Sequence, residues 1–250
     1  MFVHPASLRD LALALVADGV NDCEIARRLG IARTTVRDWR NPRYVARAGR
    51  GRGTCPRCWR PTPRIVFSDA DYAELLGLYL GDGHITSLAR TQQLRISLDA
   101  KYPNVNDETD ALLRRCFPHN RVGRVVLDGG ATVVLHVYSN HLSCLFPQAG
   151  PGKKHDRPIV LEPWQAALVT SAPWAFLRGC IRSDGCVFVN RTGAYEYLSY
   201  DFYNLSGDIR QLFVDACSEL GLACRPAGNR VRINTRESVA RLLEHVGVKS

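Results

Sequence analysis

Leu76-Gly77-Leu78-Tyr79-Leu80-Gly81-Asp82-Gly83 has a counterpart 102 positions later in the chain, Arg178-Gly179-Cys180-Ile181-Arg182-Ser183-Asp184-Gly185. Each stretch is predicted to be a short helix that carries two small residues four positions apart and ends at an Asp-Gly turn. Gly77 and Gly81 therefore lie one turn apart on one helix face, as do Gly179 and Ser183. These two faces are expected to form a close helix–helix interface, because neither presents a bulky side chain.

If the helices cross at these faces, Asp82 and Asp184 come side by side where the two helices end. The carboxylates then repel each other and the partial negative charge of the helix C-termini. A divalent cation relieves this repulsion, so the pattern predicts a metal site that also uses backbone oxygens of Gly81 and Ser183. An all-oxygen ligand set without His or Cys indicates Mg²⁺.

The two stretches resemble the paired LAGLIDADG motifs of single-chain homing endonucleases of the DOD type, with both acidic positions retained. The flanking segments Tyr72-Ala73-Glu74-Leu75 and Trp174-Ala175-Phe176-Leu177 fit the same motifs. The resemblance covers about residues 67–250. It implies an α+β endonuclease domain of two pseudo-symmetric αββαββα halves, at about 67–150 and 165–250, which form a saddle for duplex DNA.

The segments after each Asp-Gly turn follow the same order of predicted strands and helices. Apolar and polar residues alternate around Arg95, which predicts a half-buried strand with one polar face. The hairpin predicted over residues 223–234 directs Arg230 and Arg232 outward in the same way. We expect Arg95, Arg230 and Arg232 to contact DNA.

The resemblance also implies metal-dependent hydrolysis of the DNA backbone by a site that binds two or more ions, with Asp82 and Asp184 as catalytic residues and one strand cut by each half. Relatives place a basic residue beside each scissile phosphate. The segment Gly152-Lys153-Lys154-His155-Asp156-Arg157-Pro158-Ile159 resembles the one that supplies it, which makes Lys153 or Lys154 the candidate and Arg157 the second choice. Only three lysines precede Lys249, so a symmetric lysine pair is not assured.

Residues 1–48 show a different pattern, of three short helices. Asn21 or Asp22 is expected to cap the second helix, and Gly30 to form the turn before the third. The expected core face of the first helix consists of Leu8, Leu11, Leu15 and Val16. The pattern resembles the DNA-binding helix-turn-helix of transposases and resolvases. The third helix would then enter the major groove and expose Arg33, Thr34, Thr35, Arg37 and Arg40.

Residues 49–66 are rich in Arg, Gly and Pro and lack acidic residues, which predicts a linker that follows the DNA backbone. Cys55 and Cys58 have the spacing of half a zinc site. The sequence contains no second CxxC and no HxxxH, so Zn²⁺ would need ligands from scattered residues or from another chain. A pair of free thiols is the alternative.

The composition fits a protein that binds double-stranded DNA. The formal net charge is +9 and the pI is near 9.3, values typical of proteins that bind phosphate polymers. Nine cysteines, an odd number at irregular spacing, favour reduced thiols in the cytoplasm over a disulfide framework. We expect no membrane segment, no secretory signal and a monomer with internal pseudo-twofold symmetry.

Three functions share the predicted fold. The first is a site-specific double-stranded DNA endonuclease of the homing type, the kind of enzyme found in intron homing. The second is a transcriptional regulator that keeps the fold for DNA binding and does not cleave; the retention of both aspartates favours the enzyme. The third is an RNA maturase that assists intron splicing, against which the DNA-type helix-turn-helix argues.

Overall fold

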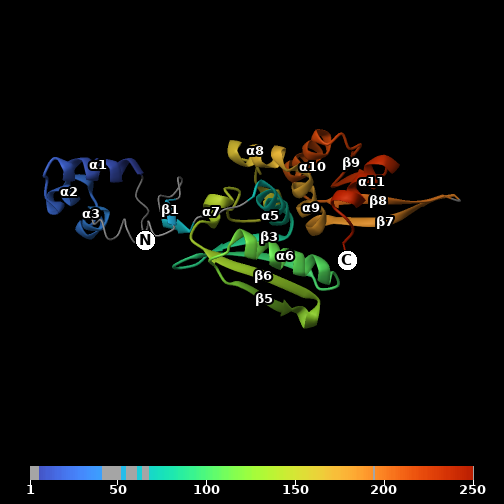
Figure 1. Cartoon of the computed structure of the whole chain (residues 1–250), viewed down its shortest axis with the longest axis horizontal. Coiled ribbons are helices and arrows are strands. Elements are labelled where there is room, and N and C mark those ends of the chain that lie inside the picture. The colour runs from blue at the N-terminus through green and yellow to red at the C-terminus, as the bar shows by residue number, and fades with distance from the viewer. Residues whose placement is uncertain (1–5, 41–51, 55–60, 64–67, 194, 250) are drawn as a thin grey trace. The chain divides into compact units, whose positions relative to one another are not determined.

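The structure is a computed structural model that describes residues 6–40, 52–54, 61–63, 68–193 and 195–249 (Figure 1). The chain divides into two compact units, Met1–Ile65 and Val66–Ser250. Cys55 and Cys58, the possible zinc ligands, lie outside the described residues.

The N-terminal unit contains three short helices, α1 (Ala6–Ala17), α2 (Asp22–Leu29) and α3 (Arg33–Arg40). Asn21 caps α2, because its side-chain oxygen accepts hydrogen bonds from the backbone N–H groups of Cys23 and Glu24 at 3.1 and 3.0 Å. Gly30 ends α2 in the left-handed conformation, with φ 64°. The cap and the turn set the path of the chain from α2 into α3.

A small apolar core holds the three helices together, formed by Ala12, Ile25, Ile31 and Val36 with partly buried neighbours such as Leu8, Leu15 and Val16. The prediction that Leu11 belongs to this core is wrong, since its side chain is 51% exposed. Ala12 takes the inward position instead. Adjacent residues of a helix point about 100° apart, which places Leu11 at the outer rim of the packed face.

Part of the predicted linker forms regular structure. β1 (Arg52–Thr54) and β2 (Pro61–Pro63) pair antiparallel, with Gly53 opposite Thr62. Proline lacks the backbone donor of a ladder and is confined to edges of sheets. A two-stranded ribbon tolerates it, because alternate residues direct their backbone groups away from the partner strand. Six residues of the predicted linker therefore form a short β-ribbon, for which the sequence pattern gave no indication.

The C-terminal unit consists of two halves with the same order of elements. The first half runs α5 (Asp69–Asp82), β3 (Gly83–Ser87), β4 (Gln92–Asp99), α6 (Pro103–Cys116), β5 (Val122–Leu127), β6 (Thr132–Ser139) and α7 (Leu142–Leu145). The second runs α9 (Pro173–Asp184), β7 (Gly185–Thr192), β8 (Tyr195–Tyr203), α10 (Gly207–Glu219), β9 (Arg225–Ala227), β10 (Arg230–Ile233) and α11 (Arg236–His245). The predicted α+β fold of two αββαββα halves is confirmed.

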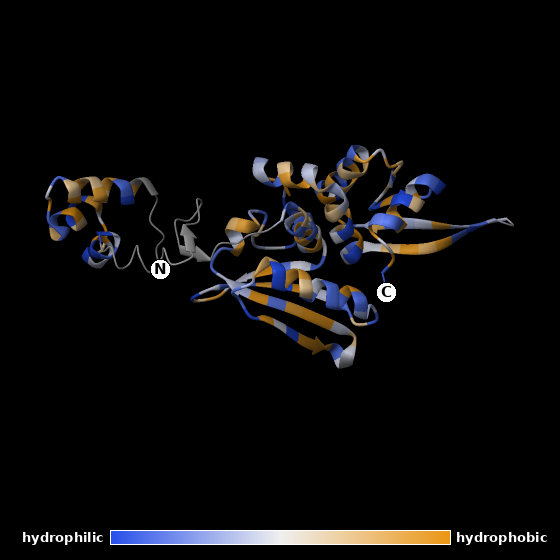
Figure 2. Ribbon diagram, viewed as in Figure 1, coloured by the Kyte–Doolittle hydropathy of each residue, from blue (hydrophilic) through white to orange (hydrophobic). Residues whose placement is uncertain are grey.

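The two antiparallel sheets have matching topologies. Their strand orders are β3-β4-β6-β5 and β7-β8-β10-β9. Gly83 pairs with Ile96 in the first sheet as Gly185 pairs with Phe202 in the second, so the register repeats as well. Hydrophobic and hydrophilic residues are interleaved along the strands (Figure 2). The apolar side chains of both sheets join one buried core with the helices.

The segment between the halves contains structure that the sequence pattern did not indicate. Helix α8 (Pro163–Ser171) begins with a capping box in which Glu162 and Gln165 bond reciprocally to each other's backbone. The fully buried Gln165 also donates to the Tyr72 hydroxyl of α5 at 2.7 Å. The Gln165–Tyr72 hydrogen bond fixes the connecting segment against α5. A 3₁₀ turn, Lys154–Asp156, precedes α8.

Helices α5 and α9 cross with their backbones in direct contact, as the small residues predict. A methyl group built on Gly77 would lie 2.6 Å from the carbonyl oxygen of Phe176. One built on Gly179 would lie 2.1 Å from the carbonyl oxygen of Glu74, and one on Gly81 would lie 2.2 Å from Oγ of Ser183. Side chains larger than those present cannot enter this contact without separating the helices.

Charged residues border the apolar crossing. Glu74 is buried and accepts hydrogen bonds from Arg178 at 3.3 Å and from Arg182 at 2.5 Å. Arg178 also donates to the carbonyl oxygen of His245, and Arg182 contacts Glu108. The two arginines that interrupt the second apolar stretch therefore lie beside the helix contact, where buried charge is paired.

The close approach predicts a large effect of one methyl group. Gly179→Ala should destabilise the C-terminal unit by about 1–3 kcal/mol or more, because the methyl group meets backbone that cannot move alone. Urea unfolding followed by circular dichroism measures the change. Gly207→Ala, in the first turn of α10, is the matched control, since its methyl group would meet nothing closer than 3.7 Å. Equal unfolding midpoints for the two variants would contradict the close contact.

Candidate metal centre

The helix crossing brings the two aspartates to the ends of α5 and α9. The Asp184 carboxylate faces the last turn of α5, since a methyl group on Gly81 would lie 2.9 Å from Oδ2 of Asp184. Burial and the neighbouring Asp184 carboxylate raise the pKa of Asp82 to about 7. Burial also raises the pKa of Asp184. The electrostatic cost expected from the sequence is thus present in the fold.

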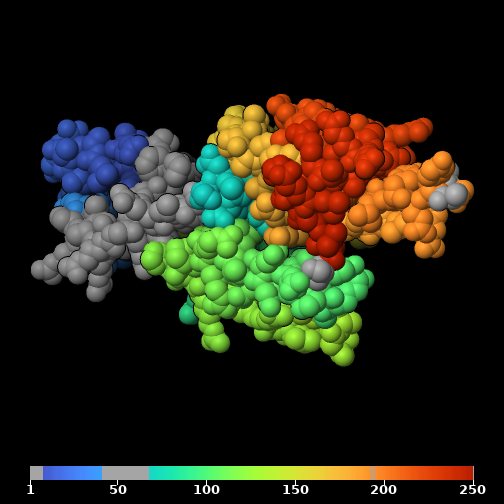
Figure 3. All heavy atoms as spheres, turned by 45° about the vertical axis from the view of Figure 1, so that its right-hand side comes forward, coloured from blue at the N-terminus to red at the C-terminus, as the bar shows by residue number. Residues whose placement is uncertain are grey.

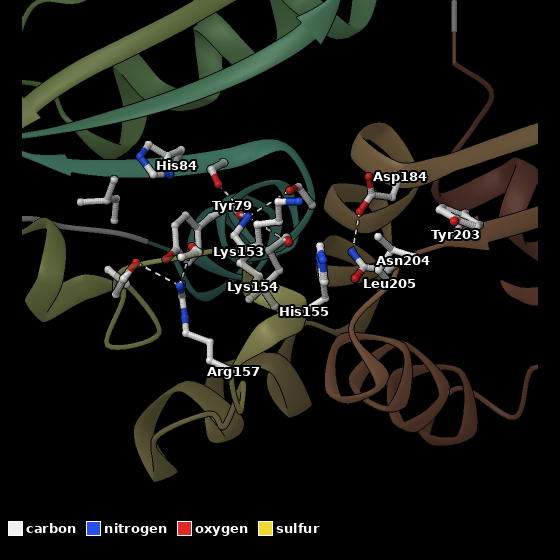
Figure 4. Close-up of a pocket in the computed structure, with 17 residues that line it drawn as sticks. Tyr79, His84, Lys153, Lys154, His155, Arg157, Asp184, Tyr203, Asn204 and Leu205 are labelled. Atoms are coloured by element: carbon white, nitrogen blue, oxygen red, sulfur yellow. Dashed lines mark hydrogen bonds between the residues drawn. The ribbon is translucent and has the colours of Figure 1, made fainter. Parts of the chain in front are cut away.

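The two carboxylates differ in their hydrogen bonds. Asn204, just after β8, donates to Oδ2 of Asp184 at 2.6 Å (Figure 4). Among the described residues, no hydrogen bond reaches the carboxylate of Asp82. By strand register, Leu98 of β4 occupies the position in the first half that Asn204 occupies in the second. The pseudo-twofold symmetry is therefore broken directly beside the carboxylates.

Lys154 closes the C-terminal end of α5. Its Nζ donates to the carbonyl oxygens of Tyr79 at 2.5 Å, Leu80 at 3.0 Å, Gly81 at 3.0 Å and Gly83 at 2.6 Å. Figure 4 shows the side chain pointing into the end of the helix. Burial lowers the pKa of Lys154 to about 8, and the charges of Asp184 and Asp82 oppose that shift.

Lys249 performs the same task at the end of α9. Its Nζ donates to the carbonyl oxygen of Ser183, and it lies 5.5 Å from the centre of the Tyr102 ring in the first half. In the space-filling view the C-terminal residues of the second half reach the surface of the first (Figure 3). Burial lowers the pKa of Lys249, again opposed by Asp82 and Asp184. The symmetric lysine pair that the sequence did not assure is present.

Two cavities flank the aspartates, one for each lysine. The first has a volume of about 470 Å³ and is lined by Lys154, Asp184 and Asn204 among others. The second has a volume of about 350 Å³ and is lined by both aspartates, Lys249 and Lys101. Each cavity thus joins a carboxylate with an ammonium group.

The oxygen atoms at the two helix ends suit a hard divalent cation, but lysine ammonium groups compete for two of them. Two carboxylates whose pKa is raised would gain from a cation, and the carbonyl oxygens of Gly81 and Ser183 lie at the same helix ends. Both carbonyls, however, already accept hydrogen bonds, from Lys154 and Lys249 respectively. Within the described residues, no three or more His, Cys, Asp or Glu side chains are grouped so that they could hold a metal ion.

The other basic residues of the connecting segment have different environments. Lys153 is exposed and lines the first cavity. The guanidinium of Arg157 donates to four backbone carbonyls, those of Gln148, Gly150, Pro151 and Gly152, at 2.8–3.0 Å. Arg157 therefore holds the loop together, and Lys154 is the residue that the fold brings to the aspartates.

The arginines predicted on the sheets lie on the faces turned away from the helices. Arg95 pairs across the first sheet with His84 and His136. Arg232 binds Asp201 through two hydrogen bonds of 2.8 and 2.9 Å, and Arg230 lies 3.6 Å from the same carboxylate. Arg95 is thus flanked by imidazoles, whereas Arg230 and Arg232 share a buried acidic partner that sequence spacing could not reveal.

In the N-terminal unit, α3 presents most of its predicted polar residues to solvent. Arg33, Thr34 and Arg37 are exposed, and Thr35 is half-buried. Arg40 is exposed but contacts Asp22 of α2 at 3.2 Å. The exposed face of α3 is therefore basic, while Val36 anchors the opposite face in the core.

The raised pKa of Asp82 predicts a pH dependence of stability. The folded protein binds this proton more tightly than the unfolded chain, so stability contributed by protonated Asp82 is lost as the pH rises from about 4 to about 7, by roughly 4 kcal/mol at most. Thermal unfolding of Asp82→Asn should show a smaller loss over this range than the parent protein.

Asp99 provides a control, because its pKa is shifted in the opposite direction to that of Asp82. The hydrogen bonds and charge of Lys101 lower the pKa of Asp99, so its contribution to stability is lost on acidification. Asp99→Asn should leave the loss of stability between pH 4 and pH 7 unchanged or increase it. An Asp82→Asn protein with the same pH profile as the parent would contradict the raised pKa.

None of the described helices combines the length and apolar character needed to cross a lipid bilayer. A family model of homeodomain-like domains matches residues 8–41, which span the three N-terminal helices. No curated protein sequence matches the chain.

Solved structures share the fold of the C-terminal unit at low identity. Mesophilic variants of the homing endonuclease I-DmoI are 13% identical over 72% of this chain and 96% of theirs, with a TM-score of 0.50. I-DmoI in complex with DNA and Ca is 14% identical over 71% and 89%, also with a TM-score of 0.50. Full-length DUF199/WhiA from Thermatoga maritima is 15% identical over 74% of this chain, with a TM-score of 0.48, and the chain spans 58% of its length. The C-terminal unit is similar to the LAGLIDADG endonuclease fold, and a homeodomain-like helix-turn-helix precedes it.

Proposed function

We propose that the chain is a site-specific endonuclease that hydrolyses phosphodiester bonds of double-stranded DNA with Mg²⁺. The observation that carries the proposal is the pair Asp82 and Asp184, placed at the ends of two crossing helices, each beside a cavity that contains a lysine. A carboxylate pair in a desolvated site is the arrangement that metal-dependent phosphoryl chemistry requires. The endonuclease fold is consistent with this chemistry and does not by itself establish it.

The residues have distinct proposed roles. Asp82 and Asp184 would hold the cations, together with the carbonyl oxygens of Gly81 and Ser183. When bound, a divalent cation activates water and stabilises charge on the phosphate. Lys154 and Lys249 would neutralise the phosphate of one strand each. Of the two candidates Lys153 and Lys154, the contacts of Lys154 at the end of α5 favour Lys154 for this role.

DNA binding is proposed for both units. The outward faces of the two sheets carry Arg95, Arg230 and Arg232, and such faces bind the backbone and base edges of a duplex. The exposed face of α3, with Arg33 and Arg37, suits the major groove. The formal net charge of +9 supports association with a polyanion.

A DNA-binding regulator that does not cut is the second candidate. The observation in its favour is that Lys154 and Lys249 already occupy carbonyl oxygens at the metal centre. A cleavage assay on a library of duplex targets with Mg²⁺ separates the two functions. Cutting of specific sites supports the enzyme, whereas tight binding without nicking supports the regulator.

Neutralising either aspartate should abolish cleavage and spare binding. We expect Asp82→Asn and Asp184→Asn to lower the cutting rate of one or both strands by at least about 100-fold, because each removes a cation ligand. Dissociation constants measured by gel shift should change little. Asp128→Asn, in the exposed turn between β5 and β6, is the control that removes the same charge elsewhere. Full cleavage by both site variants would refute the metal centre.

Arg33 tests the role of the N-terminal unit. Arg33→Ala should weaken binding of the specific target by about 1–3 kcal/mol if the guanidinium contacts a guanine. Arg33→Lys keeps the charge but loses the two parallel donors of the guanidinium, so it should retain non-specific affinity and lose discrimination. Fluorescence anisotropy with specific and scrambled duplexes measures both quantities. Unchanged anisotropy curves for both variants would exclude a contact by Arg33.

A further inference from the structure

The lysines of this chain are confined to one place. Among 33 basic Lys and Arg residues only four are lysines: Lys101, Lys153, Lys154 and Lys249. All four line the two cavities beside the aspartates, Lys153 and Lys154 in the first cavity and Lys101 and Lys249 in the second. All other basic residues of the chain, apart from histidine, are arginines. This distribution indicates that the positions beside the aspartates require an ammonium group and not a guanidinium.

The contacts of Lys154 explain why a lysine occupies this position. Its ammonium is bound by four carbonyl oxygens at 2.5–3.0 Å, and no carboxylate of the described residues accepts a hydrogen bond from it. A compact ammonium with three donors fits such a cluster of oxygens, whereas a planar guanidinium directs its donors into one plane. Lys154 is thus bound much as an inorganic cation would be, by the negative end of a helix.

Lys249 repeats the contact on the other helix, through the carbonyl oxygen of Ser183. Two ammonium groups therefore lie near two half-buried carboxylates, whose negative charge they offset. The two carbonyls involved, of Gly81 and Ser183, are the backbone oxygens expected to ligate a divalent cation. One carbonyl oxygen cannot bind an ammonium group and coordinate a divalent cation at full strength at the same time.

We propose that Lys154 and Lys249 are tethered counter-cations that compete with the divalent cation for the centre, so that a metal ion binds only when an ammonium leaves its carbonyl oxygens. The inference rests on the proposed function, because it takes Asp82 and Asp184 as the carboxylate ligands. The lysines stabilise the carboxylate pair in the absence of metal. Cation binding and ammonium binding at these carbonyl oxygens are then coupled, each weakening the other to the same extent.

Cation binding by the full chain tests the competition without relying on cleavage. Thermal unfolding is measured over a range of Mg²⁺ or Ca²⁺ concentrations for the parent, Lys154→Met, Lys249→Met and the double variant. Each lysine substitution should lower the half-saturating cation concentration by about 5- to 100-fold. Lys153→Met is the matched control: it removes the same charge from the same cavity, and its half-saturation should match the parent's.

A measurement on the unaltered protein covers the case in which a lysine variant fails to fold. With carbon-13 at the lysine Cε, the chain gives four lysine signals in an NMR spectrum, assigned from single Lys→Arg variants. Addition of Ca²⁺ should shift the signals of Lys154 and Lys249 strongly and those of Lys101 and Lys153 weakly. Equal shifts of all four signals would overturn the inference.

The outcomes separate the inference from the proposed function. If the parent binds Ca²⁺, Asp82→Asn abolishes binding and the lysine variants bind no more tightly, the metal centre stands and the competition is refuted. If neither the parent nor the lysine variants respond to Mg²⁺ or Ca²⁺, the metal centre itself is refuted, and the proposed function falls with the inference.

Discussion

The C-terminal unit depends on one contact, the approach of α5 and α9 without intervening side chains. Gly77 and Gly179 let the two backbones touch, and neither tolerates a methyl group without displacement of the partner helix. The contact leaves no room for water between the two backbones, and the aspartates at its end are half-buried. Two carboxylates that would be separate on wider-spaced helices are thereby forced into one poorly solvated environment.

That constraint explains the arrangement of charge around it. Buried carboxylates require partners, and an uncompensated charge in the interior costs several kcal/mol. At one side of the crossing Glu74 is satisfied by Arg178 and Arg182. At the helix ends Lys154 and Lys249 supply positive charge while closing helix termini whose carbonyls have no partner within the helix. The buried charge of Glu74 is thus paired with arginines of the other half, and the end of α5 is closed by a lysine of the connecting segment.

Local pattern was sufficient to predict most of the fold. The Asp-Gly repeats, the alternation around Arg95 and the hairpin glycines specify elements through interactions between near neighbours in sequence. Long-range contacts were not predictable in the same way. Nothing in the spacing of Lys249 links it to Ser183, and no local signal pairs Arg232 with Asp201 or marks α8 as a helix. Leu11 and Ala12 differ by one helical step, which periodicity cannot resolve in a 12-residue helix.

The two halves have different residues, Leu98 and Asn204, at equivalent positions beside the aspartates, so the two halves of the site are chemically distinct. A protein with two identical halves would treat a palindromic duplex the same whichever way it lay. Here one carboxylate accepts a hydrogen bond from an amide, while its counterpart lines a cavity with a leucine that has no such donor. If the proposed function is correct, the two strands of a target would be cleaved at different rates. A duplex nicked in one strand would then accumulate before the double-strand break forms.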